Sequence, residues 1–139
     1  MNIRKYSYED RDKLIRLWKK VFPNNPPHNE PGKVITEKLA VDDLIFVAEN
    51  GANIVEACMA GYDGHRGWLY SLAVEEKHQR KGIGRELVQT TISALAKLGC
   101  GKVNLQIRAG NKDVAYFYKS LGFRTEDRIS MGIHVEKGA

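Results

Sequence analysis

The chain has 139 residues, 42% of them hydrophobic, and a formal net charge of +5 at pH 7. This length suits one domain with one core, and the apolar content excludes a disordered chain. No apolar stretch is long enough for a membrane span, and the first residues lack the apolar region of a signal peptide. We therefore expect a single domain over residues 1–139 that resides in the cytoplasm without membrane attachment.

The positive charge favours an anionic partner, which could be nucleic acid, an acidic protein or a phosphorylated cofactor. The basic residues are spread along the chain, and only residues 77–85 concentrate them. Nucleic acid is therefore not the favoured partner. Two cysteines, Cys58 and Cys100, are too few for a disulfide framework.

The first third of the chain predicts one short strand and two helices. Residues 2–5 suit the strand, and Ser7 followed by Asp10 suits a capping box at the start of the first helix. Apolar residues then recur at helical spacing until Pro23 ends the pattern, and a shorter helix begins near Pro31. The side chains expected to point inward from these helices are Leu14, Leu17, Trp18, Val21, Val34, Ile35 and Leu39.

Three apolar runs at residues 44–48, 54–62 and 68–74 predict strands. An Asn-Gly pair at residues 50–51 is a strong hairpin signal, and residues 63–67 form the next turn. Because the connections are short, these strands should form an antiparallel meander.

The stretch at residues 79–84, Gln-Arg-Lys-Gly-Ile-Gly, separates the strand at residues 68–74 from a helix that ends at Gly99. Gly82 and Gly84 allow positive φ and a close approach of a ligand to the main chain. The first N–H groups of a helix lack internal partners and lie at the positive end of its dipole. The turn, with basic side chains beside it, is thus a candidate phosphate site, although a single Gly-x-Gly is a weak signal.

The remaining sequence predicts a return to the sheet. Residues 102–108 alternate as a strand, and residues 112–121 suit a short helix stopped by Gly122. Closing strands are expected near residues 123–126 and 129–135. The predicted fold is α/β (α+β), with a mixed, mostly antiparallel sheet of about six to seven strands and about four helices. A right-handed crossover makes the strands at 68–74 and 102–108 parallel.

Three blocks of sequence together resemble the GNAT superfamily of acetyl-CoA-dependent N-acetyltransferases. Residues 72–74 followed by 79–84 are similar to its coenzyme A motif, Asn111 stands after the fifth strand, and residues 115–123 resemble its aromatic-Leu-Gly-Phe block. The turn at residues 61–67 resembles that of a small bacterial branch, the YpeA-like proteins. This resemblance implies the GNAT fold and acetyl-CoA as cosubstrate, bound where two parallel strands splay apart.

The resemblance also implies which residues bind the cofactor. The main chain near Leu72 and Val74 would bond the pantetheine arm and polarise the thioester carbonyl, and the N–H groups of the 79–85 turn would bind the pyrophosphate. The implied cofactor-binding residues are Leu72, Ala73, Val74, Gln79, Arg80, Lys81, Gly82, Ile83, Gly84, Arg85, Asn111 and Tyr118.

Tyr118 matches the general acid of the family, and a phenol can protonate a thiolate leaving group. The alternative role for Tyr118 is packing one helix, and for Asn111 a cap or turn residue. Gln106 stands where many relatives carry a glutamate base, and glutamine cannot accept a proton. A water chain, or one of Glu75, Tyr70 and His65, is left as the base.

Other chemistry finds little support in the sequence. The four histidines stand without ligand spacing, so we expect no metal, and the two cysteines give no clear acyl-cysteine route. The predicted function is direct transfer of an acetyl group from acetyl-CoA to a primary amine in a ternary complex. A coenzyme A sensor without turnover is the alternative, and a small nucleic-acid binder is a weaker one. A homodimer through the closing strands is left open.

Overall fold

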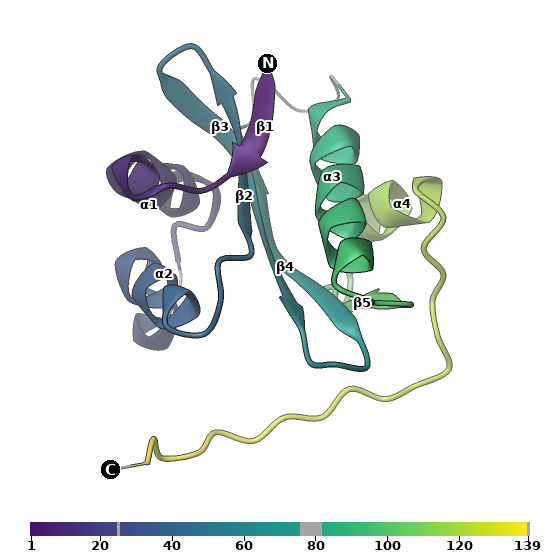
Figure 1. Ribbon diagram of the computed structural model, residues 1–139. Helices are drawn as coiled ribbons and strands as arrows, with labels where there is room; N and C mark the ends of the chain where they lie inside the picture. Colours follow the sequence, from purple (N-terminus) through teal and green to yellow (C-terminus); the bar gives the residue numbers. More distant parts are fainter. Residues whose placement is uncertain (25, 76–81, 139) are drawn as a thin grey trace. The chain divides into compact units, whose positions relative to one another are not determined.

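The computed structural model describes residues 1–24, 26–75 and 82–138. Within it the chain divides into two compact units, Met1–Gln106 and Ile107–Ala139. The first unit holds a sheet with helices on both faces, and the second holds one helix followed by an extended segment (Figure 1).

The first unit begins with strand β1 (Asn2–Lys5) and a 3-10 turn η1 (Tyr8–Asp10) that leads into helix α1 (Arg11–Val21). A second 3-10 turn, η2 (Pro27–Asn29), precedes helix α2 (Pro31–Leu39). The capping interaction predicted at the start of the first helix is present, because the Ser7 N–H donates to Asp10 Oδ2 at 2.8 Å.

The sheet has the order β1-β2-β3-β4-β5 within the described residues. Its further strands are β2 (Ile45–Asn50), β3 (Asn53–Tyr62), β4 (Gly67–Val74) and β5 (Val103–Leu105). The first three pairs are antiparallel, and β4 pairs with β5 in parallel. The crossover between β4 and β5 contains helix α3 (Ile83–Lys97), as predicted.

Helices cover both faces of this sheet. Helices α1 and α2 pack together, and α1 lies against β3 and β4, whereas α3 lies against β2 and β3 (Figure 1). The core cluster below α1 and α2 includes the predicted residues Leu14, Leu17, Trp18 and Ile35. Leu39 does not join it and is 40% exposed, because α2 ends there and the last turn points toward solvent.

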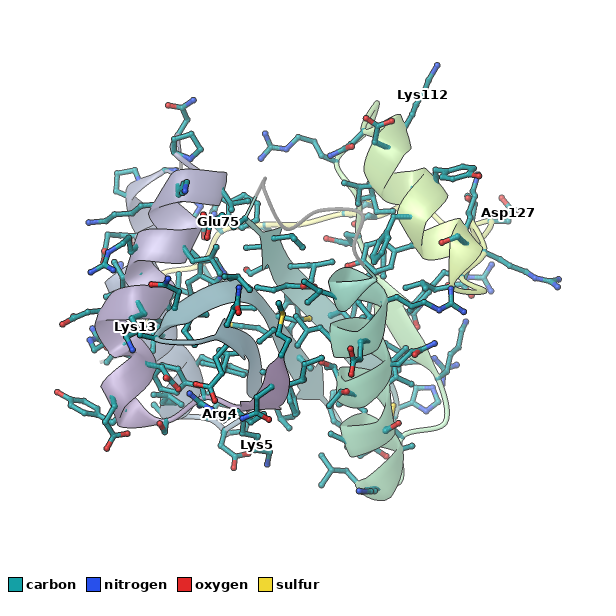
Figure 2. All side chains as sticks on the ribbon, turned by 90° about the horizontal axis from the view of Figure 1, so that it is seen from above. Arg4, Lys5, Lys13, Glu75, Lys112 and Asp127 are labelled. Carbon is teal, nitrogen blue, oxygen red and sulfur yellow. The ribbon has the colours of Figure 1, made fainter. Side chains whose placement is uncertain are left out.

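A charged cluster joins β1 to the start of α1 and to β2. The Arg4 guanidinium donates to both oxygens of Asp10, at 2.7 and 2.9 Å, and to Glu49 at 3.0 Å (Figure 2 labels Arg4). The Arg4 hydrogen bonds lower the pKa of the buried Asp10 carboxyl. This pairing allows an acidic side chain to cap the helix from inside the protein.

The second unit contains helix α4 (Lys112–Ser120), which Gly122 follows with φ +99°. The closing strands predicted near residues 123–126 and 129–135 are absent from the structure, where residues 121–138 contain no strand. The alternation of apolar side chains suits a strand, but a strand also needs a hydrogen-bonded neighbour. The described sheet therefore has five strands, fewer than the six to seven predicted.

The strand predicted over residues 102–108 is also shorter than expected, since β5 ends at Leu105. In the described sheet β5 pairs with β4, and the register between the two strands stops at Leu69. Among the residues that the structure describes, no helix combines the length and apolar content that a membrane span requires.

Candidate active site

Strands β4 and β5 are paired only at their beginning. Gly67, Trp68 and Leu69 lie opposite Val103, Asn104 and Leu105, and within the described residues this register ends there, whereas β4 runs on to Val74. The carboxyl ends of parallel strands are common ligand sites in α/β sheets. The described pairing of β4 with β5 therefore ends before Leu72 and Val74, as the predicted separation of the two strands requires.

A β-bulge interrupts β4 where this separation begins. Tyr70 lies opposite Met59 and Ala73 opposite Ala57, so Ser71 and Leu72 together face the single residue Cys58. Ser71 has φ +53° and is the one non-glycine residue with positive φ among those described. A side chain in this region costs roughly 1–3 kcal/mol, and bulges often occur beside active sites.

Two side chains approach the carbonyl groups of the bulge, and Trp18 makes the shorter contact. The Trp18 indole Nε1–H donates to the Ser71 carbonyl oxygen at 3.2 Å, and the Cys58 thiol contacts the Tyr70 carbonyl at 3.9 Å. Burial raises the pKa of Cys58 to about 12, so its thiol stays protonated near neutral pH. A protonated, buried thiol is a poor nucleophile, which argues against an acyl-cysteine route through Cys58.

Helix α3 begins at a left-handed glycine. Gly82 has φ +78° and ψ 0° at the N-cap position, and its carbonyl accepts from the Glu86 N–H at 3.1 Å. Gly84 lies inside the first turn of α3 and does not have positive φ, in contrast to the prediction. Ile83 is buried, Gly84 is partly exposed and Arg85 is exposed. Gln79, Arg80 and Lys81 lie outside the described residues.

Tyr118 and Asn111 belong to the second unit. The Tyr118 ring is buried and makes edge contacts with Phe117 and Phe123, with centroids 5.1 and 5.3 Å apart. Asn111 is the N-cap of α4, because its side-chain oxygen accepts from the Val114 N–H at 3.2 Å. The packing role and the capping role considered for these two residues are thus both present.

The candidate bases differ in their surroundings. Glu75 forms an ion pair with Lys20 at 3.0 Å (Figure 2 labels Glu75), and His65 lies exposed in the turn before β4. Burial raises the pKa of Tyr70, so its phenol keeps its proton near neutral pH. Gln106 lies beyond the end of β5, outside the strand that was predicted to hold it.

Glu56 on β3 is a buried acid that the sequence analysis did not identify. Its side chain is 0% exposed, and neither carboxyl oxygen has a hydrogen-bond partner among the residues that the structure describes. Burial, with a further contribution from the charge of Glu86, raises the pKa of Glu56 to about 8. The sequence did not predict the burial of Glu56. A polar residue between the apolar Val55 and Ala57 is also typical of a strand that has one face in solvent.

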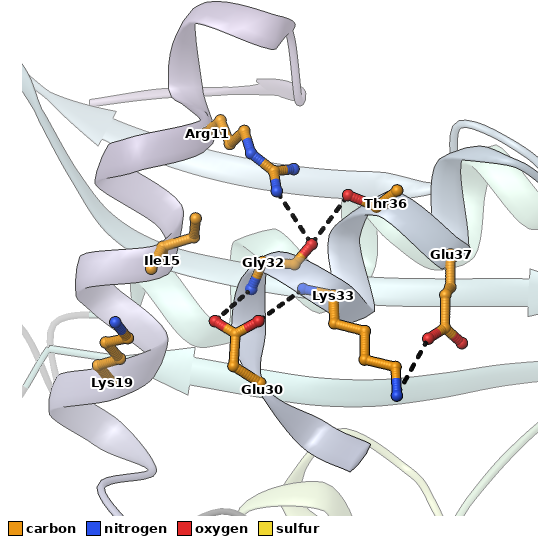
Figure 3. A pocket seen from close by; sticks show the side chains of 8 residues that line it. All are labelled: Arg11, Ile15, Lys19, Glu30, Gly32, Lys33, Thr36 and Glu37. Carbon is orange, nitrogen blue, oxygen red and sulfur yellow. Dashed lines mark hydrogen bonds and ion pairs between the residues drawn. The ribbon is translucent and has the colours of Figure 1, made fainter. Parts of the chain in front are cut away.

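An open groove of about 470 Å³ lies between α1 and α2 (Figure 3). Its polar atoms largely bind one another. Glu30 accepts from the N–H groups of Gly32 and Lys33, and Arg11 donates to the Gly32 carbonyl at 3.1 Å. Because Glu30 already caps the N-terminus of α2, the groove offers no anion site there.

No group of three or more His, Cys, Asp or Glu side chains suitable for a metal ion occurs in the part of the chain that the structure describes. A helix start beside a glycine with positive φ suits a ligand with a phosphate group.

The described sheet is mixed, with one parallel pair, β4 and β5, joined through a helix that begins after Gly82. Residues 11–123 match the model of the acetyltransferase (GNAT) family. The acetyltransferase ECA0875 of Pectobacterium atrosepticum is 37% identical over 133 residues, covering 95% of this chain and 94% of the relative. The chain belongs to the GNAT acetyltransferase family and is an acyltransferase.

Solved structures agree with the fold. The PaiA N-acetyltransferase of Thermoplasma acidophilum, solved in complex with coenzyme A, has a TM-score of 0.79 and 20% identity, with 92% of each chain covered. The ribosomal-protein-S18-alanine N-acetyltransferase of Escherichia coli has a TM-score of 0.77 and 22% identity, covering 88% of this chain and 77% of that one.

Proposed function

We propose that the protein transfers an acetyl group from acetyl-CoA directly to a primary amine while both are bound. The observation that carries this proposal is the end of the β4–β5 register just before a bulge in β4, together with the left-handed glycine at the start of α3. Membership of the acetyltransferase family supports it, as does the presence of coenzyme A in a structure of similar fold.

In this proposal the main chain does most of the binding. The pantetheine arm lies along Leu72, Ala73 and Val74, and the Leu72 N–H donates to the thioester oxygen as negative charge develops there. The pyrophosphate binds the N–H groups from the 79–81 segment to Arg85, including those of Gly82, Ile83 and Gly84. The side-chain oxygen of Asn111 caps α4, and the NH₂ group of the same amide donates to the pantetheine arm.

The chemical step needs two proton movements. The neutral amine nitrogen forms a bond to the acetyl carbon, the carbon–sulfur bond breaks, and the nitrogen loses a proton to water. Tyr118 donates its phenolic proton to the leaving thiolate and regains one from solvent. A coenzyme thiol has a pKa of about 8.5 and a phenol about 10, so this transfer is close to balanced.

The acceptor is a primary amine of a protein N-terminus, a lysine or a small molecule. Two relatives of similar fold carry N-acetyltransferase in their names, one of them with a ribosomal-protein alanine as its acceptor. An α-amine, with a pKa near 7.7–8.0, is more often neutral at pH 7 than a lysine near 10.4. In the absence of a strong base, this difference favours α-amines and other amines of low pKa.

The test is amine-dependent release of coenzyme A, measured with a thiol reagent across a panel of N-terminal peptides, lysine peptides and small amines. Tyr118→Phe should lower kcat by roughly 100-fold, because it removes the acid, while calorimetry shows acetyl-CoA binding unchanged within about twofold. Tyr116→Phe is the matched control, since Tyr116 is 77% exposed and should not affect either value. Binding of acetyl-CoA without turnover of any amine would replace the enzyme with a coenzyme A sensor.

A further inference from the structure

We infer that Trp18 is a positioning residue, whose indole N–H orients the peptide bond between Ser71 and Leu72 so that the Leu72 N–H faces the thioester oxygen. This inference rests on the proposed function, in which the Leu72 N–H is the oxyanion donor. Its basis is the hydrogen bond from Trp18 Nε1 to the Ser71 carbonyl oxygen at 3.2 Å.

The geometry of a trans peptide connects these two groups. The Ser71 carbonyl and the Leu72 N–H belong to one planar peptide unit, in which C=O and N–H point in opposite directions. No cis peptide bond occurs among the described residues. When the indole holds the carbonyl oxygen on the α1 side of the strand, it therefore also determines the direction of the N–H.

The peptide needs such a contact because its conformation is strained. Ser71 has φ +53° without being a glycine, and neither Ser71 nor Leu72 has a register partner on β3. A hydrogen bond contributes about 0.5–1.5 kcal/mol, which is comparable to the cost of positive φ. Without the indole donor, rotation of this peptide toward ordinary strand geometry becomes favourable, and the Leu72 N–H turns away.

Other observations indicate that Trp18 orients the Ser71–Leu72 peptide and does not only fill space in the core. The Trp18 side chain is 3% exposed, so packing in the hydrophobic core defines its position. On the same bulge, the Cys58 thiol contacts the preceding carbonyl, that of Tyr70. The indole N–H is thus directed at the single strained peptide, and phenylalanine could fill most of the same space without donating.

The test uses Trp18→Phe in the full chain, with Leu17→Val as the matched control from the same buried face of α1. Misplacement of a reacting contact by about 1 Å can cost up to roughly 100-fold in rate. We expect Trp18→Phe to lower kcat by about tenfold while KM for acetyl-CoA stays within about twofold. Leu17→Val should lower the melting temperature without changing kcat. Equal kcat values in wild type and Trp18→Phe would overturn the inference.

A readout without turnover separates this inference from the proposed function. In ¹⁵N-labelled protein, Trp18→Phe should move the Leu72 amide resonance and speed its hydrogen exchange, whereas Leu17→Val should not. If no amine is acetylated but the Leu72 amide responds, the positioning role of Trp18 is supported and the proposed function fails. If turnover occurs and this amide is unaffected, Trp18 has only a packing role.

Relief of the strain gives an independent check. Ser71→Gly removes the cost of positive φ, because glycine adopts that region freely. The kcat loss caused by Trp18→Phe should therefore shrink at least threefold in the Ser71→Gly background. Equal losses in both backgrounds would mean that the indole does not act through this peptide.

Discussion

Glu56 is fully buried, and neither of its carboxyl oxygens has a hydrogen-bond partner within the described part of the chain. Burial raises its pKa from 4.5 to about 8. Between these values the folded state binds a proton that the unfolded state has lost. The free energy of unfolding should therefore fall as pH rises from about 4.5 to 8, by up to about 1.4 kcal/mol per pH unit, and then level off.

Replacement of Glu56 by methionine removes this dependence. Glu56→Met keeps similar volume without a buried polar group, so we expect it to stabilise the protein by roughly 1–3 kcal/mol at pH 5 and by more at pH 8, where the wild type has lost stability through the raised pKa of Glu56. Urea denaturation of both proteins at pH 5, 7 and 9 measures the difference. An unchanged slope of stability against pH in the variant would show that another group is responsible.

Single residues were predictable where a pattern spans several of them. Leu14, Leu17 and Trp18 recur at helical spacing, and all three are buried. The positive φ of Ser71 could not be predicted, because serine gives no signal for that region and the Trp18 side chain that binds its carbonyl lies 53 residues away in the sequence. The capping role of Asn111 was one of two alternatives, and the structure shows it directly.

At the scale of elements, predictions succeeded where local chemistry determines the boundary. Glycines end α3 and α4 in the left-handed region, at Gly99 and Gly122, and Gly51 occupies the predicted hairpin turn with φ +62°. Pairing between distant strands was less predictable. The length of β5 depends on how far β4 stays beside it. Leu69 is the last residue of β4 that pairs with β5, and the bulge begins at Ser71, two residues further on.

The start of α3 allows a direct test of the glycine at its N-cap. Gly82 has φ +78° and open space where a Cβ would lie, so Gly82→Ala introduces backbone strain without a clash. We expect a loss of about 1 kcal/mol in the free energy of unfolding and about tenfold weaker acetyl-CoA binding by calorimetry.

Gly101→Ala is the matched control for this prediction. Gly101 also has open space around it, but its φ lies outside the positive region, so alanine should be tolerated with no effect on binding. If Gly82→Ala binds acetyl-CoA as tightly as wild type and is equally stable, the conformation at the start of α3 has no role in the site.

At the scale of the whole molecule, the sequence predicts strands in the segment after α4, and the residues that the structure describes there form none. Ile129, Met131, Ile133 and Val135 alternate as in a strand and are 79–91% exposed. Four large apolar side chains in one row are costly to leave in water. A second copy of the chain can cover them, which is the homodimer that the sequence left open.

We predict that the protein self-associates through residues 129–135, so that its sedimentation changes from monomer to dimer as concentration rises. Ile133→Lys places a charge in the apolar row and should abolish the dimer, because burial of an unpaired charge is unfavourable. Gly132→Lys adds the same charge on the opposite face of the extended segment and should leave the dimer intact. A monomer at every concentration, or a dimer that Ile133→Lys does not weaken, would remove this segment as the interface.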